Sequence, residues 1–116
     1  MKLTMLSRDA HVVRLACEGH LTAPTLDGSA DPFDRTLTPE DFRRTVLVDL
    51  GHAWYLNSSG ISWLIESHRR FRQEGGRLVL HSLTPFVHQI AQLTRLGSLL
   101  DVAADEAAAQ NLAAAN

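Results

Sequence analysis

The stretch that decides the fold is an apolar run followed by a serine-rich tetrapeptide: Val46-Leu47-Val48-Asp49-Leu50, and then Asn57-Ser58-Ser59-Gly60. The run 46–50 is almost continuous in apolar residues, which predicts a central strand covered on both faces. After the tetrapeptide, apolar side chains and one histidine recur at the i, i+3, i+4 and i+7 spacing of a helix face. These residues are Ile61, Leu64, Ile65, His68 and Phe71. The tetrapeptide 57–60 therefore predicts a corner where a buried strand ends and a helix begins.

The segments after this corner predict a regular alternation of strands and helices. Gly75-Gly76 ends the first helix, residues 77–81 predict the next strand, and Thr84-Pro85 opens a second helix. A short strand is predicted at 99–103, and Asp105-Glu106 caps a final alanine-rich helix. This order favours parallel strands joined by right-handed crossovers, so the predicted fold class is α/β.

The N-terminal residues predict an antiparallel hairpin at the edge of the sheet. Leu3 and Met5 alternate with polar neighbours, Arg8-Asp9 marks a turn, and residues 11–18 are a β-rich segment that stops at Gly19. Together with the later segments, the hairpin predicts a mixed, mostly parallel sheet of four to five strands, with helices packed mainly on one face.

Residues 22–45 predict an irregular surface excursion within a single domain that spans 1–116. Three prolines and a glycine interrupt this stretch, so no long regular helix is expected there. They are Pro24, Gly28, Pro32 and Pro39. The segment Thr38-Pro39-Glu40-Asp41-Phe42 predicts one capped turn with proline at the first helical position.

The composition is that of an ordinary globular protein and disfavours several other classes. The 116 residues are 45% apolar and 21% charged, and 11 Lys and Arg against 13 Asp and Glu leave a net charge of −2. That balance provides no strong field for nucleic acid or for an anionic membrane. No apolar run reaches the ~20 residues of a membrane span, and the N-terminal residues lack the features of a signal peptide.

Cys17 is the single cysteine of the chain. An internal disulfide is therefore excluded, and a reducing compartment is favoured, which we take to be the cytoplasm. We expect Cys17 to be a small apolar filler in a strand.

The predicted corner has the electrostatics of an anion-binding position. The amino end of a helix leaves backbone N–H groups unpaired and carries the positive end of the helix dipole. A serine there can cap the helix, contact the phosphate of a ligand, or become phosphorylated itself. Residues 57–60 alone do not choose among these three roles.

The order of these pieces resembles the STAS domain, and more narrowly the stand-alone bacterial anti-sigma factor antagonists, also called anti-anti-sigma factors. The resemblance covers residues 46–108 well and the N-terminal hairpin loosely. It rests on the strand 46–50, the corner 57–60, the segment Gly75-Gly76-Arg77-Leu78-Val79-Leu80 and the helix end at Leu96-Gly97. It implies a protein-binding module without catalysis or cofactor that regulates sigma-factor-dependent transcription.

The resemblance also implies a phosphorylation switch. Unmodified family members bind an anti-sigma factor that is also a serine kinase, and a PP2C-type, metal-dependent phosphatase reverses the modification. By motif match, the phosphoacceptor is Ser58, the first serine of the family's Asp-Ser-Ser/Thr-Gly motif. The residues predicted to contact the partner are Asn57, Ser58, Ser59, Gly60, Trp63, Ser67 and Arg70.

Two departures from the family pattern leave a second hypothesis open. Asn57 stands where the family has an aspartate; it still caps a helix, but it carries no charge and cannot act as a base. The irregular residues 22–45 stand where the family has a full helix. On the second hypothesis, the domain is an unphosphorylated interaction or scaffold subunit, for example in a stress-signalling or lipid-transport assembly.

Three aromatic residues and one histidine lie near the corner in sequence. Trp63 lies off the apolar stripe, one turn from the serines, and is either an exposed binding anchor or covered by a neighbouring helix. Trp54 and Tyr55 are expected in the core or in strand-end packing. His68 belongs to the apolar helix face and is expected to be a packed core residue.

Motif spacing disfavours other chemistries. The six histidines show neither HxH nor HExxH spacing and no cysteine pair supports them, so no metal site is predicted. A serine hydrolase needs Gly-x-Ser-x-Gly at its nucleophile elbow, and residues 56–60 lack the first glycine. A phosphate-loop nucleotide site is not predicted, because no glycine-rich loop leads into Gly-Lys-Ser/Thr.

Overall fold

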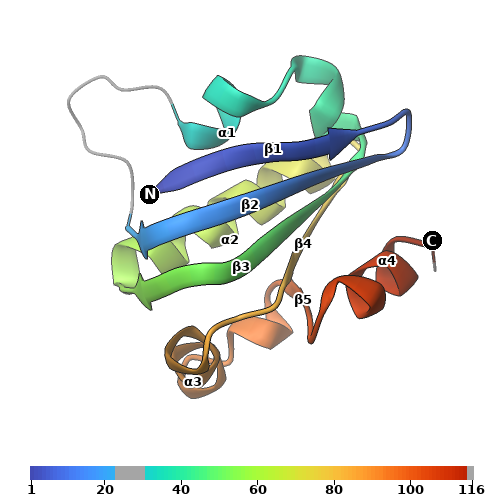
Figure 1. The fold of residues 1–116 in the computed structure, drawn as a ribbon. Helices are drawn as coiled ribbons and strands as arrows, with labels where there is room; N and C mark the ends of the chain where they lie inside the picture. The colour runs from blue at the N-terminus through green and yellow to red at the C-terminus, as the bar shows by residue number, and fades with distance from the viewer. Residues whose placement is uncertain (23–30, 115–116) are drawn as a thin grey trace.

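The computed structural model describes residues 1–22 and 31–114, and its centre is a five-stranded sheet in the order β1-β2-β3-β4-β5 (Figure 1). The strands are β1 (Lys2–Arg8), β2 (Val12–Leu21), β3 (Thr45–Leu56), β4 (Arg77–His81) and β5 (Asp101–Ala103). β1 pairs antiparallel with β2 at one edge, and the three remaining pairings are parallel. The predicted α/β class, the mixed sheet and the edge hairpin are therefore confirmed.

The helices follow the strands in the predicted alternation. They are α1 (Pro32–Thr36), α2 (Ser58–Gln73), α3 (Pro85–Leu93) and α4 (Glu106–Ala114), with short 3₁₀ turns η1 (Pro39–Arg43) and η2 (Leu96–Ser98). β3 is longer than the predicted 46–50, because its last residues pair with the end of β2, where Tyr55 lies opposite His20 and Leu56 opposite Leu21. Sequence periodicity missed this extension because two register shifts interrupt the alternation of β2 and β3.

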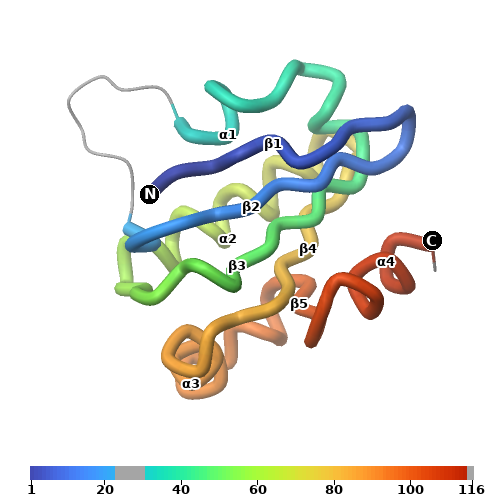
Figure 2. The backbone as a smooth tube through the Cα atoms, in the orientation of Figure 1, coloured from blue at the N-terminus to red at the C-terminus, as the bar shows by residue number. Residues whose placement is uncertain are grey.

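Helices cover the sheet unequally on its two faces (Figure 1, Figure 2). Val46, Val48 and Leu50 of β3 join the larger core, to which α1, α2 and α3 all contribute side chains. Leu47 and Val79 point to the opposite face and pack with Ala103 and Ala109, so α4 covers that face. The prediction of helices mainly on one face is confirmed.

The buried face of α2 is wider than the predicted stripe. Its buried residues are Gly60, Trp63, Leu64, Ser67 and Phe71, whereas Ile61 and Ile65 are only partly buried. The face extends toward Trp63 and Ser67 because α1 packs against that flank, a contact that helical periodicity cannot reveal. His68 is half-buried, and burial lowers the pKa of its imidazole, which favours the neutral ring.

Within the described residues, the stretch 22–45 contains two short helical pieces, α1 and η1. The prediction of a surface excursion is wrong for these pieces, because Phe33, Leu37 and Phe42 are buried in the core. The predicted capped turn is confirmed as η1, with Pro39 in its first turn. Its carboxylate Asp41 is fully buried and accepts hydrogen bonds from Arg8 at 2.6 and 3.0 Å, from Arg44 at 2.6 Å and from the Thr38 N–H at 2.9 Å. Burial alone raises the pKa of Asp41, but these donors outweigh it and hold the pKa at about 2. The part of the prediction that concerns 23–30 lies outside the described residues.

Cys17 is buried in β2, and burial raises the pKa of its thiol to about 12. It is therefore the unreactive apolar filler that the sequence predicts.

Among the helices of 1–22 and 31–114, none has both the length and the apolarity that crossing a membrane requires.

Candidate functional site

The corner between β3 and α2 is built by Asn57. β3 ends at Leu56, α2 begins at Ser58, and Asn57 is the N-cap with an extended backbone at φ −121°. Its side-chain Oδ1 accepts the Gly60 N–H at 3.0 Å and the Ser59 hydroxyl at 2.7 Å. Asn57 thus satisfies one of the unpaired N–H groups of the helix start and also fixes the orientation of Ser59.

Gly60 allows the start of α2 to approach the end of β2. A Cβ built on Gly60 lies 1.9 Å from the carbonyl oxygen of Leu21, far inside contact distance. The same carbonyl accepts the N–H of Asn57 at 3.5 Å. The corner is therefore held against β2 by a close backbone approach that only glycine permits.

The two serines of the corner have different environments. Ser59 is half-buried and donates its hydroxyl to Asn57. Ser58 occupies the first helical position and is exposed, and its hydroxyl has no hydrogen bond to residues 1–22 or 31–114. The first turn of α2 contains no acidic side chain, so the positive end of the helix dipole at Ser58 is not neutralised by its own helix. Ser58 is the hydroxyl that an approaching protein can reach.

Trp63, Ser67 and Arg70 lie together, but on the flank of α2 that faces α1. Trp63 is 7% exposed: its ring stacks on Phe33 at 5.0 Å between centroids, and its Nε1 donates to Asp31 at 2.7 Å. The exposed-anchor interpretation of Trp63 is wrong, and the alternative, in which a neighbouring helix covers it, holds because α1 packs there. Ser67 is also buried, at 6% exposed.

Arg70 holds α1 against α2. Its guanidinium donates to the carboxylate of Asp34 at 2.6 and 3.0 Å and lies 4.0 Å from the ring centre of Phe42. The hydrogen bond from Arg70 lowers the pKa of Asp34. Arg70 therefore forms its ion pair within the domain, and this pair joins two segments that are far apart in sequence.

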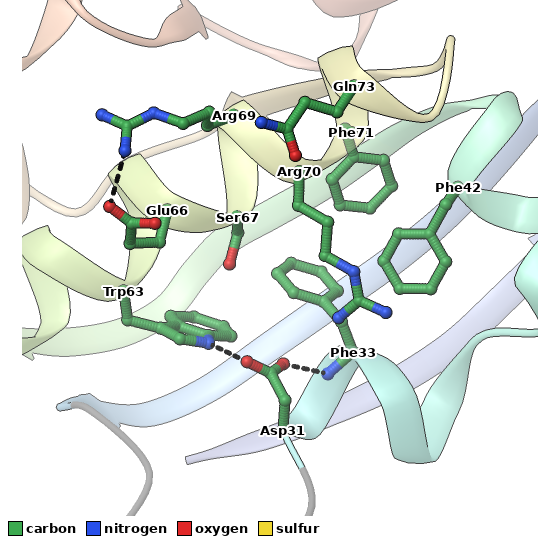
Figure 3. A pocket seen from close by; sticks show the side chains of 10 residues that line it. All are labelled: Asp31, Phe33, Phe42, Trp63, Glu66, Ser67, Arg69, Arg70, Phe71 and Gln73. Atoms are coloured by element: carbon green, nitrogen blue, oxygen red, sulfur yellow. Dashed lines mark hydrogen bonds and ion pairs between the residues drawn. The ribbon is translucent and has the colours of Figure 1, made fainter.

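These residues border a pocket of about 460 Å³ between α2 and the segment 31–42 (Figure 3). Aromatic rings form its walls, and Ser67 and Arg70 point into it from α2. The lining residues are Asp31, Phe33, Phe42, Trp63, Glu66, Ser67, Arg69, Arg70, Phe71 and Gln73. Sequence reasoning missed this pocket because Asp31 and Phe33 meet Trp63 only in the folded chain.

Trp54 and Tyr55 lie at the end of β3 and are exposed, at 59% and 39%. Of the two predicted alternatives, packing at the strand end is therefore confirmed and a position in the core is wrong. Tyr55 stacks on Phe86 of α3 at 6.0 Å, and His20 contacts both Tyr55 and Trp54 at 5.3 and 5.9 Å. These rings form an exposed aromatic group on the same sheet edge as the corner. β3 continues past residue 50 with a buried-exposed-exposed pattern that sequence periodicity could not anticipate.

Comparison with known proteins agrees with this architecture. The family described as "Mlab, STAS domain" matches residues 4–101, which is most of the chain. This chain belongs to the STAS domain family. The match includes the strand β3, the corner 57–60 and α3, so the corner described above is a corner of a STAS domain.

One curated relative of this STAS domain comes from Bordetella bronchiseptica and is named "Putative anti-sigma factor antagonist BtrV". It is 30% identical over 111 residues, which cover 94% of this chain and 91% of the relative. The sequence-based resemblance to anti-sigma factor antagonists is confirmed at the level of the family.

Solved structures share the fold at lower identity. An anti-sigma factor antagonist (STAS) domain protein from Planctomyces limnophilus has a TM-score of 0.65 at 18% identity, covering 98% of this chain and 99% of its own. The anti-sigma factor antagonist SpoIIAA in its unphosphorylated form has a TM-score of 0.60 at 19% identity, covering 95% of each chain. SpoIIAA of Bacillus in its phosphorylated form has a TM-score of 0.54 at 16% identity, covering 95% of this chain and 98% of its own.

Proposed function

We propose that this STAS domain is a cytoplasmic anti-sigma factor antagonist that acts as a phosphorylation-controlled binding module. In its unmodified form it binds an anti-sigma factor that is also a serine kinase, through the corner 57–60. Phosphorylation of Ser58 releases that partner, and a PP2C-type phosphatase restores binding. The observation that supports this proposal is the exposed Ser58 hydroxyl at the start of α2, beside a Ser59 hydroxyl that Asn57 already holds.

A phosphate on Ser58 should affect binding far more than folding. It adds a charge of roughly −1.5 to −2 at neutral pH. The amino end of α2 accommodates that charge, with a gain of roughly 0.3–1 kcal/mol. In a complex, the same charge is stripped of water and left unpaired, at a cost of roughly 2–5 kcal/mol, which corresponds to about 30-fold to several-thousand-fold in affinity. This asymmetry suits a switch.

The comparisons support the proposal without reaching Ser58 itself. The curated relative carries the name of an anti-sigma factor antagonist, and the fold is that of SpoIIAA, a protein with both an unphosphorylated and a phosphorylated form. Asn57 cannot serve as a base for phosphoryl transfer. We therefore assign the base to the kinase, and the capping of α2 to Asn57.

Phosphorylation is tested by incubating the chain with ATP and each purified kinase-type anti-sigma factor of the same genome, followed by mass spectrometry of the peptides. We expect one phosphate, on Ser58, that disappears in Ser58→Ala and persists in Ser59→Ala. Ser59→Ala is the matched control because it removes a hydroxyl from the same turn. A phosphate on another residue, or tight anti-sigma factor binding retained by Ser58→Glu, would contradict the switch.

The second candidate is a scaffold or interaction subunit that is never phosphorylated. Two observations favour it: Asn57 replaces the usual aspartate, and the matching family is the one described as "Mlab, STAS domain". In that case Ser58 contacts the partner as a neutral hydroxyl. Affinity purification that recovers membrane-transport subunits and no kinase, with Ser58 unmodified, would favour this candidate over the first.

A further inference from the structure

Two long segments of this chain contain no charged residue. Residues 50–65 lie between Asp49 and Glu66 without a Lys, Arg, Asp or Glu, and residues 78–94 lie in the same way between Arg77 and Arg95. All 24 charged side chains of the chain, 11 basic and 13 acidic, lie outside these two segments. A charged fraction of 21% spread evenly would place several charges in each of them.

The fold brings these two segments to the same edge of the sheet (Figure 1). The first contains the end of β3 and the start of α2, and the second contains the end of β4 and all of α3. Tyr55 of β3 stacks on Phe86 of α3 with an angle of 15° between the rings. The Thr84 hydroxyl donates to the carbonyl of Ala53 at 2.7 Å. They therefore form one continuous surface.

This surface exposes large apolar side chains. In the described part of the chain six large apolar residues are exposed, and four of them are here: Trp54, Tyr55, Phe86 and Leu93. Along α3, Phe86, the partly exposed Ile90 and Leu93 have the i, i+4, i+7 spacing of one helix face. The other face of α3 packs into the core through Val87 and Ala91. We call Trp54, Tyr55, Phe86, Ile90 and Leu93 the neutral surface.

The exposed side of α2 shows the contrast. Beyond its first two turns, α2 exposes Glu66, Arg69 and Arg72 to solvent, as is usual for a surface helix. An exposed apolar group that also lacks charge is typical of the centre of a protein–protein interface, where charged residues are depleted and aromatic residues enriched. The neutral surface has both features, exposed aromatic side chains and no Lys, Arg, Asp or Glu.

The neutral surface is continuous with the corner. Ser58 follows Tyr55 by three residues in the first uncharged segment, and Asn57 keeps that segment neutral where an aspartate would charge it. With the histidines counted as neutral, a phosphate on Ser58 would be the first formal charge in either segment. A partner face shaped for an uncharged apolar surface offers no cation to pair with it, so the charge would remain unpaired in the complex.

We propose that the neutral surface is the principal docking site for the anti-sigma factor, and that the partner presents an uncharged, apolar face to it. This inference rests on the proposed function and specifies the partner's chemistry. It predicts that aromatic and aliphatic anchors provide the affinity, that salt bridges contribute little, and that any single negative charge next to the corner weakens the complex.

The first test is the salt dependence of binding, measured by isothermal titration calorimetry with the purified kinase-type anti-sigma factors of the same genome. For the factor that binds the wild-type chain, we expect Kd to change by less than about 3-fold between about 50 and about 500 mM NaCl, because salt screens only charged contacts. Weakening by more than about 10-fold over that range would show an ionic interface and overturn the proposal.

The second test removes the anchors. Trp54→Ala, Phe86→Ala and Leu93→Ser should each weaken binding by about 10-fold or more, as buried anchors of an interface do. The matched control is Leu99→Ser, which alters an apolar side chain that is 54% exposed but borders the charged half of α2, with Arg69 and Arg72. All four positions are solvent-exposed, so thermal melts should show folded variants. If the three anchor variants and the control bound the partner with equal affinity, the proposal that the neutral surface is the docking site would be overturned.

The third test adds a charge without changing shape. Asn57→Asp keeps a capping oxygen for α2, but places a carboxylate next to Ser58. We expect it to weaken binding by about 5-fold or more, and unchanged affinity would contradict the requirement for neutrality. Failure of the wild-type chain to bind any of the anti-sigma factors contradicts the proposed function itself. Binding that the anchor and Asn57 variants do not affect contradicts only this inference.

Discussion

The corner at 57–60 and the cluster around Asp41 are both small polar groups, yet their surroundings give them opposite roles. At the corner, Ser58 is exposed and its neighbours Asn57 and Ser59 hydrogen-bond to each other. In the cluster, the carboxylate of Asp41 is inaccessible and accepts hydrogen bonds from Arg8, Arg44 and the Thr38 N–H. Burial and complete internal pairing make the second group structural, whereas an accessible hydroxyl leaves the first available to another protein.

Among the substitutions at these two groups, Asp41→Ala is expected to lower the free energy of unfolding most. The substitution leaves the Arg8 and Arg44 guanidinium groups without their shared carboxylate and should reduce the free energy of unfolding by about 3 kcal/mol. Urea denaturation followed by circular dichroism measures the loss. The matched control is Asp34→Ala, which breaks the exposed pair with Arg70 and should cost less than about 1 kcal/mol. Equal losses in the two variants would show that burial does not distinguish these ion pairs.

A slightly smaller effect is expected from Gly60→Ala, which strains the corner itself. The added Cβ falls 1.9 Å from the Leu21 carbonyl oxygen, so α2 must shift away from β2, at a cost of about 2–3 kcal/mol. Unlike Asp41→Ala, this change should also weaken partner binding because it moves Ser58. Gly97→Ala serves as the control, because a Cβ there meets no atom within 4 Å. A melting temperature of Gly60→Ala equal to that of Gly97→Ala would refute the close approach.

The pH dependence of stability separates the two groups further. Asp41 has a folded pKa of about 2 against an ordinary value of 3.8. Its contribution is present in full above pH 3.8 and is lost as the pH falls through the folded pKa. A shift of this size corresponds to about 2 kcal/mol. Wild-type stability should fall more steeply with acid between about pH 4 and pH 2 than that of Asp41→Asn. If the stabilities of the wild type and of Asp41→Asn fell in parallel with pH, the lowered pKa of Asp41 would be contradicted.

The smallest effects on folding are expected at the corner. Asn57→Ala removes the cap of α2 and should cost about 1 kcal/mol. Ser58→Ala removes a hydroxyl that makes no hydrogen bond to any described residue and should change the free energy of unfolding by less than about 0.5 kcal/mol. Chemical denaturation of both variants checks this order. A large loss from Ser58→Ala would mean that Ser58 is structural, like Asp41, and would remove the contrast between the two groups.

Local periodicity and turn chemistry were sufficient for most of the fold. The strand around Val46–Leu50, the start of α2 after Asn57 and the η1 turn opened by Thr38-Pro39 all follow from patterns within a few residues. The position of Ser58 at the first residue of α2 also follows from the Asn57 cap, whereas its exposure depends on what the fold packs beside it.

What the sequence could not show was which flank of α2 would be covered. Trp63 was equally compatible with exposure and burial, and the stacking of Phe33 and the hydrogen bond to Asp31 decided it. These contacts join residues 30 and 32 positions apart. The pocket beside Arg70 and the end of β3 depend on the same kind of long-range packing.

The α/β alternation, the serine-bearing corner and the absence of Lys, Arg, Asp and Glu from 50–65 and 78–94 follow from the order of neighbouring residues. The meeting of the two uncharged segments through Tyr55 and Phe86, and the inward orientation of Trp63, arise only in the folded chain. Exposure depends on what the folded chain packs against each side chain, and residues far away in sequence contribute that packing.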